Sequence, residues 1–201
     1  MSVQDRSPSP TTPFIPSQTA RTAERPKPGS SARGPALAVL RIMMGLTFLW
    51  AFLDKLFGLG YSTSPAQAWI SGGSPTKGFL GHVQVGPMQS TLRDWAGAGW
   101  ADWLFMLALL GLGIALLLGV ALRPAAAAGT ILLALMWIAE WPLAQSTSAG
   151  TATSSTNPLI DYHLVYLVVL IALAAFAAGD TWGLGHRWAK LDLVRRTPWL
   201  R

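Results

Sequence analysis

The chain of 201 residues contains no cysteine, and this absence excludes several kinds of chemistry. Disulfide bonds, thiolate catalysis, cysteine-ligated zinc and ordinary iron–sulfur clusters all require thiols. Charged residues are also scarce, at 12% of the chain, against about 25% in an average soluble domain. No phosphate-binding loop, dinucleotide-binding glycine pattern, histidine-rich zinc signature or serine triad can be assembled. The sequence is therefore interpreted from its apolar residues, which make up 51% of it.

The first 34 residues lack apolar runs. This stretch is rich in Ser, Thr and Gln, and its prolines are Pro8, Pro10, Pro13, Pro16, Pro26 and Pro28, with Pro35 following at the border. Such a composition cannot bury enough apolar surface to offset the entropy lost on ordering. It also lacks the apolar core and small-residue cleavage site of a secretory signal peptide. We predict a disordered tail over residues 1–34.

Four apolar stretches follow, and each is close to the ~20 residues that a membrane-spanning helix needs. They cover residues 36–57, 101–122, 125–144 and 159–178. Buried helices of a soluble protein of this length seldom give four such runs. We predict an all-α fold, a four-helix transmembrane bundle over residues 35–180 that contacts the lipid bilayer.

Lys and Arg are distributed unevenly between the loops. They gather in three places: residues 1–34, Arg123 and residues 181–201. The long loop over residues 58–100 carries only Lys77 and Arg93, and the loop over residues 145–158 carries no charge. Because cytoplasmic loops are enriched in Lys and Arg, both termini are predicted to be cytoplasmic. This distribution also accounts for the net charge of +6 without a nucleic-acid partner.

Two segments outside the four runs are expected to lie at the membrane surface. In the loop over residues 58–100, short helices are predicted around residues 65–70 and 88–95, with tryptophans at the outer interface. Residues 181–201 place Leu184, Trp188 and Leu191 along one face beside basic residues. That pattern predicts a basic amphipathic helix on the anionic inner surface.

The few ionisable residues in the apolar runs converge on one level. At about 1.5 Å per residue, Asp54 and Lys55 lie within roughly 5 Å of the outer end of the first helix. Glu140 and His163 lie about 6 Å inside the outer edge on the third and fourth helices, and Asp102 lies near the surface. Ionisable groups at membrane depth are costly, and each is by default a functional candidate.

Aromatic residues share helix faces with these groups, as the spacings i, i+3 and i, i+4 show. The side chains that would wall a pocket are Trp50, Trp137, Trp141, Tyr162 and Tyr166. The candidate catalytic groups are Glu140, His163, Asp54 and Lys55. Such a pocket would accept a flat ring such as a quinone, with imidazole and carboxylate exchanging its protons. No haem is expected, because His163 has no histidine partner on a facing helix, and no metal site is predicted.

Structural alternatives remain open for each of these residues. Asp54 and Lys55 are close enough to the interface to act as snorkelling anchors. Glu140 would be satisfied by an ion pair with Lys55 or a hydrogen bond to His163. Arg41 would snorkel inward or pair with lipid phosphate.

Asp161 follows the Asn157–Pro158 helix-start signal, so its role would be to complement the dipole at the helix N-terminus. Asp161 and His163 are two residues apart, and on a helix such side chains point nearly opposite ways. The sequence does not decide which of them faces the interior.

The first two runs resemble the DoxX family. The first carries an Arg-bearing helix that ends in a Lys-Leu pair, here Arg41, Gly45, Lys55 and Leu56. The second is a glycine-rich helix that ends in a basic residue and small residues, here Gly111, Gly119, Arg123 and Ala125. The resemblance extends over residues 36 to about 180. It implies a small four-helix protein of the bacterial cytoplasmic membrane.

Relatives in that family include the large membrane subunit of thiosulfate:quinone oxidoreductase, and others that act as membrane partners of soluble redox enzymes. The long outer loop is similar to that of the thiosulfate-enzyme subunit. However, the predicted cluster has more carboxylates than cations. It would repel a dianion such as thiosulfate unless carboxylates are protonated or Lys77 and Arg93 fold over the pocket.

Two hypotheses follow. The chain is the membrane subunit of a quinone-linked oxidoreductase, with a quinone as cofactor, or a non-catalytic scaffold that docks a soluble redox enzyme. A second small subunit and a homo-oligomer are both left open as partners.

Overall fold

The computed structural model describes residues 30–153 and 155–201, and this part of the chain contains helices and no strand longer than an isolated bridge between Ser146 and Ala152. The predicted disordered tail lies, for residues 1–29, outside the described residues. The elements in chain order are α1 (Ser30–Phe57), η1 (Pro65–Gln67), η2 (Trp69–Ser71), α2 (Lys77–Gly81), α3 (Gln89–Trp95), α4 (Gly99–Leu118), α5 (Leu122–Glu140), α6 (Tyr162–Ala175), η3 (Ala178–Asp180), α7 (Gly185–Trp188), α8 (Asp192–Arg196) and η4 (Pro198–Leu200). The all-α prediction is confirmed for these residues.

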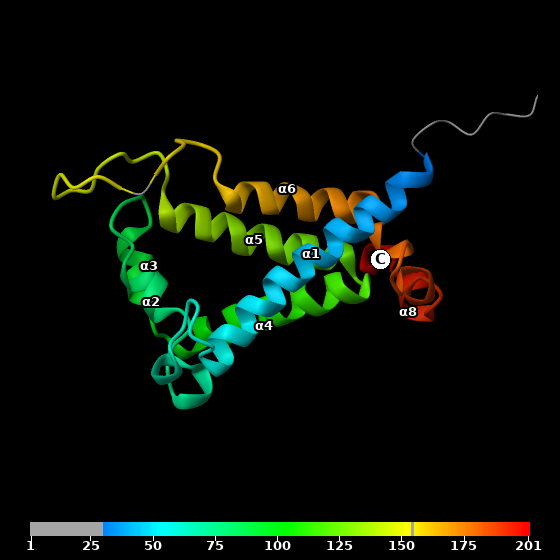
Figure 1. The fold of residues 1–201 in the computed structure, drawn as a ribbon, viewed down its shortest axis with the longest axis horizontal. Coiled ribbons are helices and arrows are strands. Elements are labelled where there is room, and N and C mark those ends of the chain that lie inside the picture. Colours follow the sequence, from blue (N-terminus) through cyan, green and yellow to red (C-terminus); the bar gives the residue numbers. More distant parts are fainter. Residues whose placement is uncertain (1–29, 154) are drawn as a thin grey trace, which may run out of the picture.

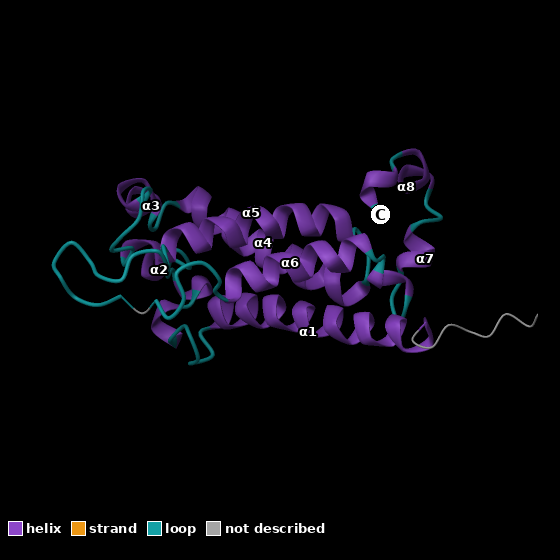
Figure 2. Ribbon diagram, turned by 90° about the horizontal axis from the view of Figure 1, so that it is seen from above, coloured by secondary structure: helices purple, strands orange, loops and turns teal. Residues whose placement is uncertain are grey.

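The four longest helices lie side by side and share one apolar core (Figures 1 and 2). α1 packs on α4, α4 on α5, and α5 on α6. Glycines allow these helices to pack closely. A Cβ on Gly113 of α4 would lie 2.9 Å from Leu49 of α1, and a Cβ on Gly129 of α5 would clash with Leu170 of α6. The loops 58–98 and 141–161 lie at one end, here called the loop end, and α7 and α8 lie at the other, here called the terminal end (Figure 2).

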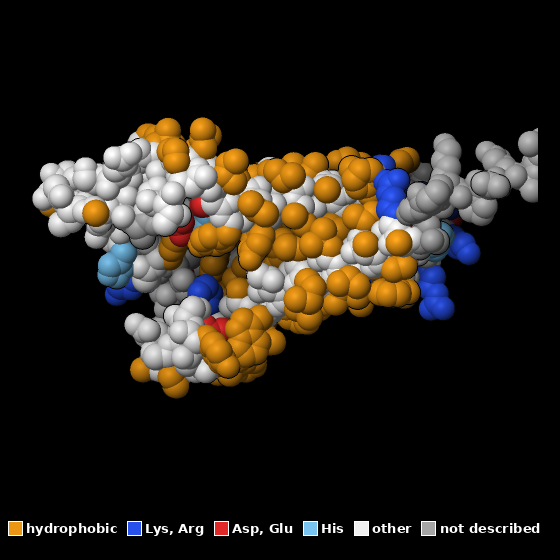
Figure 3. Space-filling model, turned by 45° about the horizontal axis from the view of Figure 1, so that its top comes forward, with side chains coloured by type: hydrophobic (Ala, Val, Ile, Leu, Met, Phe, Trp, Pro, Cys, Tyr) orange, Lys and Arg blue, Asp and Glu red, His pale blue; other side chains and the backbone are white. Residues whose placement is uncertain are grey.

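Three of these helices are long and apolar enough to cross a membrane: Ala32–Phe57, Gly99–Leu118 and Leu122–Glu140. Their outward faces are apolar as well, so that hydrophobic side chains cover the long sides of the molecule and the charged side chains gather toward its two ends (Figure 3). Such a surface is stable only against lipid. The protein is a multi-pass membrane protein, and its outer helix faces contact the bilayer.

The fourth apolar helix is shorter than the run that predicted it. α6 has 14 residues, from Tyr162 to Ala175. Asp161 before it is extended, and after it Ala177 adopts a left-handed conformation with φ 48°. Hydropathy predicted a longer helix, over residues 159–178, because the residues that flank α6 are also apolar.

Several helix boundaries differ from the predicted runs. α5 covers Leu122–Glu140 where residues 125–144 were predicted, because Trp141 is left-handed with φ 39° and Pro142 follows it. The starts and ends predicted at residues 36 and 122 also differ. α1 begins at Ser30, inside the predicted tail and before Pro35, where the Arg33 guanidinium lies 4.3 Å from the Phe176 ring centre. α4 ends at Leu118 because Gly119 takes the left-handed conformation, with φ 70°, that terminates a helix.

The C-terminal segment is two short helices rather than one amphipathic helix. α7 and α8 are separated by a turn, and the segment folds back onto α5, where the Arg123 backbone N–H donates to the Arg201 carbonyl at 3.0 Å. Trp188 Nε1 also donates to the Leu200 carbonyl at 2.6 Å. Leu184 and Leu191 are exposed, but they precede two different helices and do not form one helix face.

Arg41 is fully buried, and the snorkelling prediction is wrong for it. Its guanidinium donates to backbone carbonyls from three parts of the chain, which are those of Leu116, Leu117, Ala178, Thr181 and Trp182. Two of these carbonyls belong to the last turn of α4, where the helix dipole favours a cation. Arg41 therefore joins α1, the C-terminus of α4 and the segment after α6.

Candidate functional site

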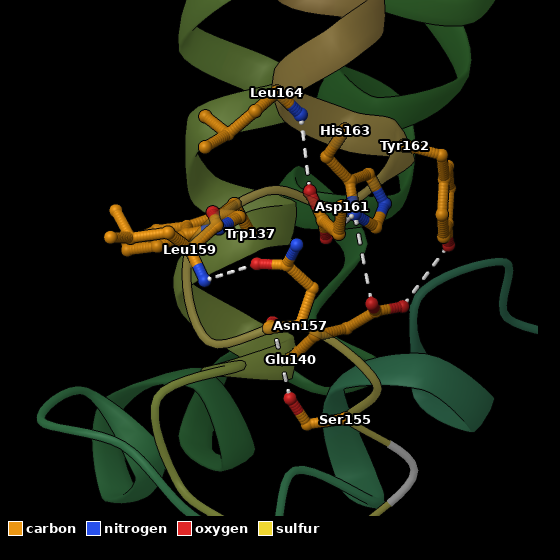
Figure 4. Close-up of polar contacts among 9 residues, drawn as sticks. All are labelled: Trp137, Glu140, Ser155, Asn157, Leu159, Asp161, Tyr162, His163 and Leu164. Atoms are coloured by element: carbon orange, nitrogen blue, oxygen red, sulfur yellow. Dashed lines mark hydrogen bonds and ion pairs between the residues drawn. The ribbon is translucent and has the colours of Figure 1, made fainter.

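At the loop end, α5 and α6 bring together Glu140, Asp161, Tyr162 and His163 (Figure 4). Glu140 is the last residue of α5, and Asp161 is the N-cap of α6. His163 lies in the first turn of α6 and is fully buried, whereas the side chains of Glu140 and Asp161 are 35% and 16% exposed. The cluster therefore extends from a partly exposed carboxylate to a buried imidazole.

Each carboxylate uses one oxygen for a local hydrogen bond and presents the other to His163. Asp161 Oδ1 accepts from the Leu164 backbone N–H at 3.1 Å, and Asp161 Oδ2 lies 2.8 Å from His163 Nδ1. Glu140 Oε1 accepts from the Tyr162 hydroxyl at 3.1 Å, and Glu140 Oε2 lies 3.7 Å from the same Nδ1. His163 Nε2 is buried and has no hydrogen-bond partner among the described residues.

The loop before α6 is fixed by side chains that satisfy its backbone. Asn157 Oδ1 accepts from the backbone N–H groups of Leu159 and Ile160 at 2.9 and 3.0 Å, which is the turn that an Asn before a helix favours. Trp137 Nε1 donates to the Leu159 carbonyl at 3.0 Å, and Ser155 Oγ donates to the Pro142 carbonyl at 2.6 Å. These bonds hold the start of α6 against the end of α5.

The sequence left open whether Asp161 serves the N-terminus of the helix or faces the interior, and in the structure it does both. It caps α6 and also contacts His163, because its own backbone is extended, with φ −117° and ψ −176°. The rule that residues two apart point opposite ways applies within a helix. Asp161 lies just outside it, and the sequence prediction missed it as a site residue for that reason.

Asp54 and Lys55 lie at the loop end but form a separate contact. Asp54 is buried and accepts from the Ser62 backbone N–H at 2.9 Å, the Ser62 hydroxyl at 2.6 Å and the Tyr61 N–H at 3.3 Å. Lys55 Nζ donates to Ser62 Oγ at 3.3 Å. Within the described residues no ion pair joins Lys55 to Glu140, so that structural alternative for Glu140 is wrong. Glu140 Oε2 does approach His163 Nδ1, but at 3.7 Å the contact is longer than the hydrogen bond of the other alternative.

Asp102 also serves the loop next to it. It accepts from the Thr76 hydroxyl at 2.6 Å, the Thr76 N–H at 2.9 Å and the Ser74 hydroxyl at 2.9 Å. The ionisable groups expected at one level therefore form three separate local sites. Among these three, the site between α5 and α6 contains the most titratable groups.

The five aromatic residues predicted to line one pocket also lie in separate groups. Trp50 packs edge to face on Tyr61, with centroids 5.1 Å apart, and Trp137 packs on Trp141 at 5.7 Å. Tyr162 lies beside His163 at 4.0 Å and beside Tyr166 at 5.9 Å. Of the predicted aromatic residues, Tyr162 touches both Glu140 and His163, and Trp137 positions the loop.

An apolar cavity of about 290 Å³ lies between α4, α5 and the loop helices α2 and α3. Its lining includes Phe79, Trp95, Trp100, Phe105, Ile131 and Met136, and it includes none of the five aromatic residues predicted to wall a pocket. Met136 lies i, i+4 from Glu140 on α5 and so shares a face with it one helical turn away. The tryptophans of the loop were the signal for this cavity, and the sequence analysis assigned them to the interface.

Comparisons with known proteins found one family and no individual relative. No curated protein matches the chain, and no solved structure matches it. A family model matches residues 36–141, which is more than half of the chain and covers α1, α4 and α5 together with Glu140. Asp161 and His163 lie beyond the matched residues. The description of that family is DoxX.

Proposed function

Because this chain belongs to the DoxX family, we propose that it is the membrane subunit of a quinone-linked oxidoreductase, with Glu140 and His163 exchanging protons at the loop end. The observation that carries the proposal is the buried imidazole of His163, which faces two carboxylates. One of these, Glu140, lies one helical turn along α5 from Met136, which lines the apolar cavity. Imidazole and carboxylate are the usual groups for general acid and base chemistry.

The proposed topology has four spans with both termini in the cytoplasm. Basic side chains at the terminal end include Arg123, Arg187, Lys190, Arg195 and Arg196, whereas the loop end carries Lys55, Lys77 and Arg93. The excess of Lys and Arg favours the cytoplasmic side for the terminal end. In a bacterial cytoplasmic membrane, the Glu140–His163 pair would then lie near the outer surface.

The roles within the cluster follow from exposure and hydrogen bonding. Glu140, with its partly exposed side chain, is placed to exchange protons with water, and His163 to carry them inward. Asp161 positions the imidazole, because its Oδ2 accepts from Nδ1–H and leaves the lone pair on Nε2. Nε2 is then the atom that accepts a proton on the buried side.

The cavity supports the quinone part of the proposal. A quinone takes up two protons and two electrons on reduction, and its ring and tail are apolar. The cavity between α4 and α5 is lined almost entirely by apolar and aromatic side chains, as ligand sites commonly are. With no cysteine in the chain, the electrons would come from a partner subunit or soluble enzyme.

The test is purification of the whole chain in lipid nanodiscs, followed by extraction of quinones and identification of co-purifying proteins. We expect one quinone per chain, with the pH dependence of its reduction altered in Glu140→Gln and His163→Ala. His186→Ala is the control, because His186 is exposed at the terminal end.

A preparation without quinone, together with unchanged activity in Glu140→Gln, would overturn the proposal. A soluble redox enzyme that co-purifies without quinone would instead establish the scaffold function.

A further inference from the structure

We propose that Glu140, Asp161 and His163 bind a divalent first-row transition-metal ion. The inference rests on the geometry of the cluster and stands independently of the quinone. Glu140 Oε2, Asp161 Oδ2 and His163 Nδ1 converge, and donor atoms of the three residues lie within 4.8 Å of one another.

The distances are close to those of a metal site. With metal–ligand distances of about 2.1 Å and tetrahedral angles, two donor atoms on one ion lie roughly 3.4 Å apart. In the structure Nδ1 lies 2.8 Å from Asp161 and 3.7 Å from Glu140, on either side of that value. A change of a few tenths of an ångström in side-chain position would bring both carboxylates onto one ion.

The surrounding hydrogen bonds hold the donors in place. The Tyr162 hydroxyl occupies the other oxygen of Glu140, and the Leu164 N–H occupies the other oxygen of Asp161. Outer contacts of this kind orient metal ligands and leave one oxygen of each carboxylate directed at the ion. The arrangement thus has an inner group of donors and an outer group that fixes them.

The charge of the cluster supplies a second indication. His163 is fully buried, and its Nδ1 is directed at the two carboxylates. Within the described residues no Lys or Arg forms an ion pair with either carboxylate. A divalent ion beside Nδ1 would therefore supply the positive charge that neighbouring Lys and Arg side chains do not.

The donor set selects the class of ion. One imidazole and two carboxylates suit Zn²⁺, Mn²⁺ or Fe²⁺, whereas a soft ion would require thiolate or thioether ligands. Ca²⁺ and Mg²⁺ prefer oxygen ligands alone. An ion bound here would compete with protons for Nδ1 and the carboxylates, and would inhibit the proton exchange proposed for Glu140 and His163.

The experiment measures binding directly, on the full chain in nanodiscs after removal of metals with a chelator. Mn²⁺ is titrated and the free ion is counted by electron paramagnetic resonance, while Zn²⁺ is titrated by calorimetry. We expect one ion per chain, displacement of Mn²⁺ by Zn²⁺, and no displacement by equimolar Ca²⁺. Glu140→Gln and His163→Ala should each weaken binding at least tenfold.

Two further variants make the test specific. Tyr162→Phe keeps the ring and removes the hydroxyl on Glu140, and should weaken binding about tenfold, as loss of an outer-shell partner does. His186→Ala removes an imidazole that lies beside Asp180 at the exposed terminal end, and should leave binding unchanged. Circular dichroism and size-exclusion profiles establish that each variant is folded.

The inference is overturned by a stoichiometry near zero, by binding that survives in the Glu140→Gln/His163→Ala double variant, or by equal competition from Ca²⁺. Quinone content is measured in the same preparations. Quinone without metal binding would contradict this inference alone, and metal binding without quinone would contradict the proposed function alone.

Discussion

The two ends of the helices each hold a fully buried basic side chain, and the two are satisfied in opposite ways. At the terminal end, every nitrogen of the Arg41 guanidinium donates to a backbone carbonyl. At the loop end, His163 has one nitrogen beside two carboxylates and the other without a partner among the described residues. The two sites thus differ in the completeness of their hydrogen bonding and not in burial. Arg41 is interpreted as a structural link, and His163 is the group for which we propose proton exchange.

The comparison predicts that loss of Arg41 has the largest effect on stability. Arg41→Met should lower the free energy of unfolding by about 3 kcal/mol or more, because it leaves buried carbonyls of α4 and of the segment after α6 without a donor. The measurement is thermal unfolding in nanodiscs. Arg195→Met is the matched control, since Arg195 is exposed, and it should change little. Equal stability of the two variants would contradict the structural role of Arg41.

The second-largest loss of stability is expected at Gly179, which is closely packed beside Arg41. A Cβ on Gly179 would lie 2.1 Å from the Gly119 carbonyl oxygen, so Gly179→Ala should cost roughly 1–3 kcal/mol in the same assay. Gly111 is the control glycine, because a Cβ there meets nothing within 4 Å. Gly111→Ala should be neutral or slightly stabilising, as Ala favours a helix. If both glycines tolerate Ala equally, the contact between the segment after α6 and the end of α4 is looser than described.

At the loop end, two variants of Asp161 distinguish its capping of α6 from its positioning of His163. Asp161→Ala loses the bond to the Leu164 N–H and should lower stability by about 1 kcal/mol. Asp161→Asn retains a capping oxygen and should cost less, yet it removes the charge beside Nδ1 of His163. Nitrogen NMR of His163 should then show a changed tautomer in Asp161→Asn. An unchanged spectrum would assign Asp161 to capping alone.

Glu140→Gln should have the smallest effect on stability. The side chain is 35% exposed, and Gln preserves an oxygen that accepts from the Tyr162 hydroxyl. We expect a change of about 0.5 kcal/mol or less, typical of surface positions, while Mn²⁺ binding falls. A large loss of stability would place Glu140 in the same structural class as Arg41.

The helices were predictable because lipid-facing helices need unbroken apolar sequence. Hydropathy located α1, α4 and α5, but the predicted run over residues 101–122 continued past Gly119, where α4 ends. The burial of Arg41 was not predictable, because its partners are backbone carbonyls, which have no sequence signature. Composition predicted a polar tail up to residue 34, whereas α1 begins at Ser30, and Arg33 within it packs on the Phe176 ring.

The candidate site was predictable in part. Glu140, His163 and Tyr162 were identified from their depth and spacing, and they do lie together. Asp54 and Lys55 were placed at the right end, but helix rise gives depth and not direction around the bundle. Asp161 was missed because a capping residue does not follow the angular period of the helix it starts. Sequence periodicity therefore identifies the level of such a site more reliably than its members.

The brevity of α6 has a consequence for the surrounding lipid. At 1.5 Å per residue its 14 residues measure about 21 Å, whereas the hydrocarbon core of a bilayer is about 30 Å thick. As the fourth span that we propose, a helix this short would draw the headgroup layer toward the midplane or rely on its flanking segments to complete the crossing. The first turn of α6 carries His163, so a thinned bilayer at that point would shorten the distance from bulk water to the imidazole. Membrane thickness would thereby determine how freely this site is hydrated.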